Sequence, residues 1–217
     1  MDVRYACEPA PDAAVNEDHV LHTGPLVAIF DGVSAPQGLD TGYIHGTSWY
    51  VDRLAGRLTE TTATPDIDLR HGLAAAIEAV RGDHGGTCDP THPGTPAASL
   101  CIIRERGDTL DYLILCDCTL VADPAGQTQM HTDTRFTNAM ADIRATTLTG
   151  GAPIGSPEHA AQVRHATQQR SPTVAARRRG RGDRCRAAPF LGAGAPAVRI
   201  GLPAFWRRLQ ETRGATL

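Results

Sequence analysis

The chain has 217 residues, of which 41% are hydrophobic, 21% charged and 5% aromatic, and its formal net charge at pH 7 is −3. This is the composition of an ordinary globular protein, and the length predicts one domain with room for an appendage. No apolar stretch approaches the roughly 18 residues of a membrane span, and the N-terminus lacks the basic head and apolar segment of a signal peptide. We therefore expect a cytoplasmic protein without a membrane partner.

Charge is divided unevenly along the sequence. Residues 1–163 hold 22 Asp and Glu against 9 Arg, whereas residues 164–217 hold 2 acidic residues against 12 Arg. We therefore predict a folded part over 1–163 and a basic tail rich in Arg, Ala, Gly and Pro over 164–217. The tail has three interpretations: a disordered segment, an out-of-frame translation of a GC-rich gene, or an arm that binds nucleic acid through Arg177–Arg184. All 21 basic residues are arginine, so a lysine-dependent phosphate-binding P-loop is excluded.

The first predicted element is a short interior strand over Leu26–Phe30, because the run is apolar and too short for a buried helix. It leads directly into Asp31 and Gly32. A carboxylate followed by a backbone carbonyl that glycine brings close is an oxygen ligand set that suits Mg²⁺ or Mn²⁺. Asn16-Glu17-Asp18 supplies two more carboxylates upstream. The alternative is an ordinary turn, since Asp-Gly after an apolar run is a common turn signal.

Two helices and a series of strands are predicted next. Apolar residues recur at helical spacing over 43–58, and again over 69–80 after Asp68, which is suited to cap the second helix. Strands are expected at 97–104, 110–117, 119–122 and 127–131. Because helices and strands come in separate blocks, the predicted fold class is α+β, with helices covering an antiparallel sheet.

Several motifs in this order resemble the PP2C-type (PPM) metal-dependent serine/threonine protein phosphatases. Asn16-Glu17-Asp18 and Asp31-Gly32 match the two N-terminal metal motifs of that family. Thr95–Ile103, Tyr112–Cys118 and Met130–Asp133 are similar to its later strand motifs. The resemblance covers roughly residues 14–160. It implies a β-sandwich flanked by helices, and we expect this sandwich to be incomplete on its C-terminal side.

The resemblance also implies a reaction, the hydrolysis of phosphoserine or phosphothreonine in a phosphoprotein by water activated between two Mn²⁺ or Mg²⁺ ions. Asp31 would bridge the ions, and the carbonyl of Gly32 would complete the ligands of one of them. Glu17 and, less directly, Asp18 would orient metal-bound water. Asp117 would support the floor of the site or cap a turn.

The sequence departs from the family pattern at two important points. Ala13 stands where the family has a phosphate-binding arginine. Beyond residue 160 the only acidic side chains are Asp183 and Glu211, and neither recovers the family's C-terminal metal motifs. We therefore expect weak or absent phosphatase activity. The alternative function is that of a non-catalytic relative, a pseudophosphatase that binds a phosphoprotein partner.

Cysteine and histidine give no predicted metal site. The six cysteines form no C-x-x-C pair, and Cys116 and Cys118, expected on one strand, are interpreted as small buried hydrophobes. The nine histidines are scattered. His19 and His22 alone approach metal-ligand spacing, and a loop or strand-edge position explains them better than zinc.

Overall fold

The structure is a computed structural model that describes residues 1–9, 13–33, 41–89, 92, 95–135, 138, 141, 152, 156–158 and 161–162, together with the backbone of 197–201. Its main sheet has five strands in the order β1-β2-β3-β4-β7, and a second sheet pairs β5 with β6. All neighbouring strands are antiparallel. The elements are β1 (His19–Thr23), β2 (Leu26–Val33), α1 (Thr47–Thr61), α2 (Leu69–Asp83), β3 (Ala97–Arg106), β4 (Thr109–Leu115), β5 (Thr119–Ala122), β6 (Gln129–Thr132) and β7 (Ala197–Gly201).

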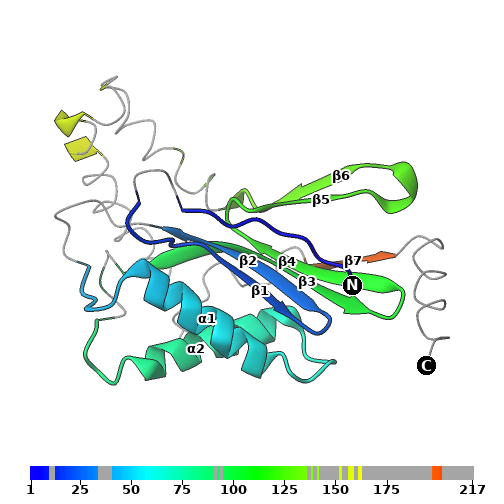
Figure 1. The fold of residues 1–217 in the computed structure, drawn as a ribbon, viewed down its shortest axis with the longest axis horizontal. Helices are drawn as coiled ribbons and strands as arrows, with labels where there is room; N and C mark the ends of the chain where they lie inside the picture. Colours follow the sequence, from blue (N-terminus) through cyan, green and yellow to red (C-terminus); the bar gives the residue numbers. More distant parts are fainter. Residues whose placement is uncertain are drawn as a thin grey trace.

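The main core lies between the large sheet and the two helices, which cover the same face of it (Figure 1). Alternate residues of β2 point into this core, and apolar residues at helical spacing meet them from α1 and α2. The buried apolar residues of this core are Leu26, Ala28, Phe30, Val51, Leu54, Ala55, Leu58, Leu69, Leu73, Ala76, Val80, Leu100, Ile102 and Leu113.

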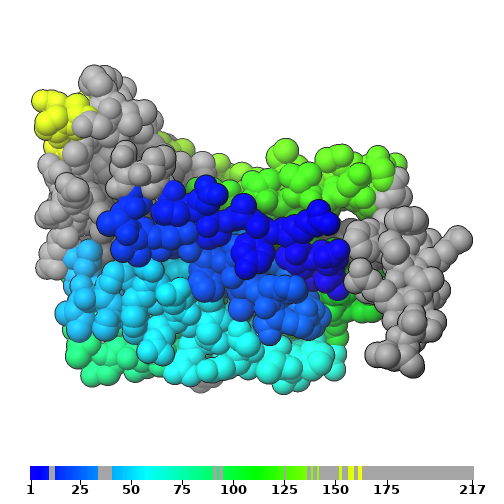
Figure 2. Space-filling model, in the orientation of Figure 1, coloured from blue at the N-terminus to red at the C-terminus, as the bar shows by residue number. Residues whose placement is uncertain are grey.

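The opposite face of the sheet carries a smaller apolar cluster. Cys101, Tyr112 and Ile114 of the sheet pack there with Cys118 at the start of the β5–β6 hairpin. The hydroxyl of Tyr112 lies 3.0 Å from Nδ1 of His131 in β6, which ties the hairpin to the sheet. In Figure 2 the dark-blue N-terminal residues run between the cyan helices and the green hairpin on the side that faces the viewer.

The predicted α+β class, with helices on an antiparallel sheet, is confirmed. The hairpin and the helices lie on opposite sides of the large sheet (Figure 1), which is the plan expected of a helix-flanked sandwich. None of the helices in the described part of the chain is both long and apolar enough to cross a membrane.

Some predicted boundaries were wrong. The first helix begins at Thr47 and not at residue 43, because Gly46 is extended (φ −76°, ψ 172°) and serves as its N-cap. The strand predicted over 110–117 ends at Leu115, where Cys116 enters a turn with φ +65°. Cys116 and Cys118 therefore do not share one strand face.

Two strands were not predicted. β1 was missed, and β7 lies within residues 164–217, where only a basic tail was expected. β7 pairs with β4 along the edge of the large sheet. The rest of that segment, with Arg177–Arg184, Asp183 and Glu211, lies outside the described residues, so the boundary at residue 163 stays a prediction.

Candidate metal centre

Asp31 lies inside β2, two residues before the strand ends, and not after the strand as predicted. Its pairing partner is Ser99 in β3, and the Ser99 hydroxyl donates a hydrogen bond of 3.2 Å to Oδ2 of Asp31. Because side chains alternate along a strand, Asp31 points away from the helices while its neighbour Phe30 points into the main core. The carboxylate is therefore exposed on the face of the sheet that the helices leave uncovered.

The acidic segment Asn16-Glu17-Asp18 runs beside the end of β2. It precedes β1, which pairs antiparallel with β2 so that His19 lies opposite Phe30. The backbone N–H of Gly32 donates to Oδ1 of Asp18 over 3.3 Å, and the N–H of Asp18 donates to Oδ1 of Asn16 over 3.0 Å. The two motifs, thirteen residues apart in sequence, are therefore in direct hydrogen-bonded contact.

Gly32 lies so close to this segment that no side chain fits there. A Cβ atom at this position would lie 2.3 Å from the backbone carbonyl oxygen of Glu17 and 2.9 Å from Cγ2 of Thr47. Both approaches are shorter than a van der Waals contact, and the nearer atom is backbone. Glycine is required here by the packing of Glu17 against β2.

Negative charges accumulate around Asp31. Partial burial against the sheet raises the pKa of its carboxyl, the charges of Asp18 and Asp117 raise it further, and only the Ser99 hydrogen bond opposes them. A divalent cation would offset the neighbouring charges that disfavour the ionisation of Asp31. Their oxygens also match the ligand preference of Mg²⁺ and Mn²⁺.

The carboxylates do not form a closed ligand set. Across the described residues, three ligand atoms of His, Cys, Asp or Glu within 4.8 Å of one another occur at His45, His84 and Cys88, and not around Asp31. A Mg²⁺ or Mn²⁺ ion held by one or two carboxylates keeps several water ligands, so open spacing fits these ions and not zinc. The residues therefore fit a hydrated divalent cation.

The structure brings together four residues that the sequence singled out: Asp31, Gly32, Asp18 and Glu17. Asp117 lies in the exposed turn after β4, near enough for its charge to act on Asp31. Ala13 is exposed. The roles of these residues as ligands or as water-orienting groups remain predictions.

Ser99 was missed as part of the site. It was expected within a strand, but its contact with Asp31 depends on a register that joins residues 68 positions apart. Cys118 lies nearby as well. Burial, with smaller effects from Asp31 and Asp117, raises the pKa of its thiol to about 11, so it is protonated and unreactive at neutral pH. Cys118 is thus a buried hydrophobe, as predicted for it.

His19 and His22 lie on β1, an edge strand of the sheet. Nδ1 of His19 lies 2.9 Å from the carboxylate of Asp52, and His22 is exposed. A strand-edge position, one of the two explanations considered for this pair, therefore accounts for it. The histidines that do lie together with a cysteine, His45 and His84, were not predicted.

No protein-family model and no curated protein matches the chain. Several solved structures do match the chain. The Mycobacterium tuberculosis serine/threonine phosphatase PstP/Ppp is 20% identical, with a TM-score of 0.46, over 63% of this chain and 56% of that one. The catalytic domain of PstP in complex with two manganese ions is 22% identical, with a TM-score of 0.46, over 63% and 57%. The PPM Ser-Thr phosphatase MsPP from Mycobacterium smegmatis, in complex with cacodylate, is 20% identical, with a TM-score of 0.40, over 59% and 51%.

This chain thus spans little more than half the length of the structures to which it is similar. The identities are below 25% and the TM-scores below 0.5, so the similarities assign no activity. The solved structures that this chain resembles, over 59 to 63% of its residues, are serine/threonine phosphatases of the PP2C/PPM type.

Proposed function

We propose that the chain is a PP2C-like protein phosphatase domain that hydrolyses phosphoserine or phosphothreonine and depends on Mn²⁺ or Mg²⁺ held at Asp31. The observation that carries this function is the contact between Asp18 and the backbone of Gly32, which joins the two acidic motifs at one end of the sheet. A turn-forming Asp-Gly pair, the plain alternative, would not need an acidic segment packed against it.

Each residue has a role that follows from its contacts. Ser99 donates to Oδ2 of Asp31, and Oδ1 would be the oxygen that binds a cation. Asp18 accepts a hydrogen bond from the N–H of Gly32 and so fixes the backbone of Gly32. The carbonyl of Gly32 is the expected second ligand. Glu17 is half-buried, and its backbone packs against Gly32, so this residue lies next to the site. Bound divalent ions would supply an activated water and offset the charge that develops on the phosphoryl oxygens.

Hydrolysis of p-nitrophenyl phosphate and of a phosphothreonine peptide by the full chain, with Mn²⁺ or with EDTA, tests this function. We expect turnover that requires the metal and that falls by about 100-fold or more in Asp31→Asn, because metal stabilisation of the transition state contributes several kcal/mol. Asp123→Asn is the matched control. It makes the same change at an exposed carboxylate in the turn between β5 and β6, and we expect it to keep full activity.

Two results would contradict the catalytic function. One is turnover that survives in Asp31→Asn or that does not depend on metal. The other is a folded wild-type chain without turnover in Mn²⁺.

A specific observation favours a second function, that of a non-catalytic phosphoprotein-binding module. Ala13 is exposed at the position where the family resemblance implies a phosphate-binding arginine, and the carboxylates near Asp31 do not form a closed ligand set among the described residues. Binding of the phosphothreonine peptide without turnover, and weaker binding of its unphosphorylated form, is the result that this function predicts.

A further inference from the structure

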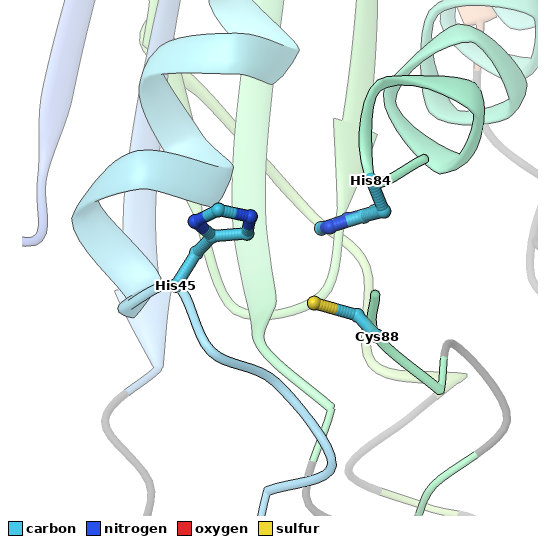
Figure 3. A group of neighbouring side chains, drawn as sticks. All are labelled: His45, His84 and Cys88. Atoms are coloured by element: carbon cyan, nitrogen blue, oxygen red, sulfur yellow. The ribbon is translucent and has the colours of Figure 1, made fainter. Parts of the chain in front are cut away.

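A second group of ligand side chains lies where α1 begins and α2 ends. His45 precedes the N-cap of α1, His84 is the C-cap of α2, and Cys88 follows four residues later. Their ligand atoms all lie within 4.8 Å of one another. Figure 3 shows the three side chains pointing toward a common centre from the start of one helix, the end of the other and the loop beyond it.

His84 is unusual among buried polar side chains, because its ring nitrogens have no hydrogen-bond partner among the described residues. Its side chain is buried, with 4% of its surface exposed, and neither Nδ1 nor Nε2 has a hydrogen-bond partner among the described residues. Imidazole nitrogens are strong hydrogen-bonding groups, and burial without a partner is unfavourable. A ligand that accepts the lone pair of one nitrogen would satisfy it.

The protonation state of His84 suits such a ligand. Burial lowers its pKa, and the charge of His45 lowers it further. The charge of Asp83 opposes this shift. A lowered pKa favours neutral imidazole, which is the form that binds a metal.

Aromatic contacts hold both rings in place without using their nitrogens. His45 stacks on Trp49 with ring centroids 4.0 Å apart, and Tyr43 meets His84 edge-on at 4.5 Å. The loop that carries Cys88 is fixed as well, because the Asp89 N–H donates to the carbonyl of Gly42 over 2.9 Å. The three ligand side chains are therefore held near one another by contacts independent of any ion.

We propose that His45, His84 and Cys88 bind one Zn²⁺ ion, with water in the fourth position. Two imidazoles and one thiolate form a borderline-soft donor set that suits zinc and not Mg²⁺ or Mn²⁺. Tetrahedral zinc with bonds of about 2.0–2.3 Å places its donors about 3.3–3.6 Å apart. The ligand atoms of the three side chains lie within 4.8 Å of one another. Each pair of ligand atoms therefore needs to approach by at most about 1.5 Å to bind zinc.

Such an ion would join the start of α1 to the end of α2. The two helices already pack side by side against the sheet. Zinc would fix their ends and the loop through Cys88 in one arrangement. Its ligands are different residues from those around Asp31, so the proposal does not rest on the phosphatase function. The start of α1 also contacts the end of β2, because the Thr47 hydroxyl donates to the carbonyl of Val33 over 3.4 Å.

Cobalt substitution tests the site directly. The full chain is purified in EDTA, freed of chelator and titrated with Co²⁺, then with Zn²⁺ in competition with a chromophoric chelator. We expect one equivalent of Co²⁺ to produce a near-ultraviolet thiolate-to-cobalt charge-transfer band and the visible absorption of a tetrahedral ion, and Zn²⁺ to displace both.

The variants Cys88→Ser and His45→Phe remove one ligand each, and the second keeps an aromatic ring against Trp49. We expect the first to abolish the charge-transfer band and both to weaken Zn²⁺ binding by at least about 10-fold. Cys7→Ser and His71→Asn are the matched controls, at a half-buried cysteine outside the group and at a histidine whose side chain is 83% exposed. Both controls should bind like the wild type, and so should Asp31→Asn.

Thermal unfolding distinguishes a variant that has lost a metal ligand from one that has lost its fold. Zinc should raise the melting temperature of the wild type, because it binds the native state, and leave that of Cys88→Ser unchanged. The zinc site is disproved if the wild type shows no charge-transfer band, if Cys88→Ser or His45→Phe binds as tightly as the wild type, or if Cys7→Ser removes the band.

Discussion

At the scale of single residues, Gly32 determines how closely the two acidic motifs approach. We predict that Gly32→Ala lowers the free energy of unfolding by about 1–3 kcal/mol, because its Cβ would lie 2.3 Å from the Glu17 carbonyl and the backbone must move. The same change at Gly56, exposed in α1 with nothing within 4 Å of the added atom, should stabilise by about 0.5–1 kcal/mol. Urea unfolding of both variants measures this. Changes of the same sign would contradict it.

Asp31 should destabilise the protein when no metal is bound. The pKa of Asp31 in the folded state lies above the ordinary 3.8 of the unfolded chain. Between 3.8 and the folded-state pKa, the folded chain therefore binds more protons than the unfolded chain. The free energy of unfolding falls as the pH rises through that window. We therefore predict that Asp31→Asn, which keeps an oxygen for Ser99, raises the melting temperature in EDTA at pH 7. This gain should disappear as the pH approaches 3.8.

A series of thermal melts from pH 4 to pH 8 measures that gain. In Mn²⁺ the melting temperature of the wild type should rise to that of Asp31→Asn, because the cation compensates the charges of Asp31, Asp18 and Asp117. A lower melting temperature of Asp31→Asn in EDTA at pH 7 would show that these charges do not oppose folding.

At the scale of elements, α2 has a side-chain cap and α1 does not. Asp68 accepts from the N–H groups of Arg70 (2.9 Å) and His71 (3.4 Å). We predict that Asp68→Ala costs about 0.5–2 kcal/mol and that Asp68→Asn costs much less, since asparagine also caps helices. Equal losses in urea unfolding would contradict a capping role.

The cap also predicts the direction of a pH effect. The hydrogen bonds and ion pair with Arg70 lower the pKa of Asp68, so its contribution is complete above the ordinary value of 3.8 and is lost as the pH falls below it. The difference between wild type and Asp68→Ala should therefore shrink in acid.

Local patterns were sufficient to predict several elements. Asp68 and the apolar period that follows it predict α2, and β5 spans the predicted residues 119–122. Pairing was harder to predict. Asp31 was placed after its strand because the apolar run stops at Phe30, whereas the ladder with β3 continues to Val33. β1 was missed because its five residues, His-Val-Leu-His-Thr, carry only a weak alternation.

At the scale of the whole molecule, the two faces of the large sheet differ. Helices bury one face, whereas on the other Ile29 and Val33 remain 42% and 44% exposed beside Asp31. The motifs predicted that Asp18, Asp31 and Gly32 meet, since their order along the chain resembles that of a known family. The Ser99 contact and the His45, His84 and Cys88 group depend on how distant elements pack, and no local pattern indicates them.

Binding of Mn²⁺ to the metal-free chain, followed by the electron paramagnetic resonance signal of the unbound ion, tests the central claim most directly. We predict that the wild type removes Mn²⁺ from solution, that Asp31→Asn weakens this binding by at least about 10-fold, and that Asp123→Asn and Cys88→Ser leave it unchanged. Equal binding by wild type and Asp31→Asn, or no binding by the folded wild type, would contradict the assignment of a metal centre to Asp31.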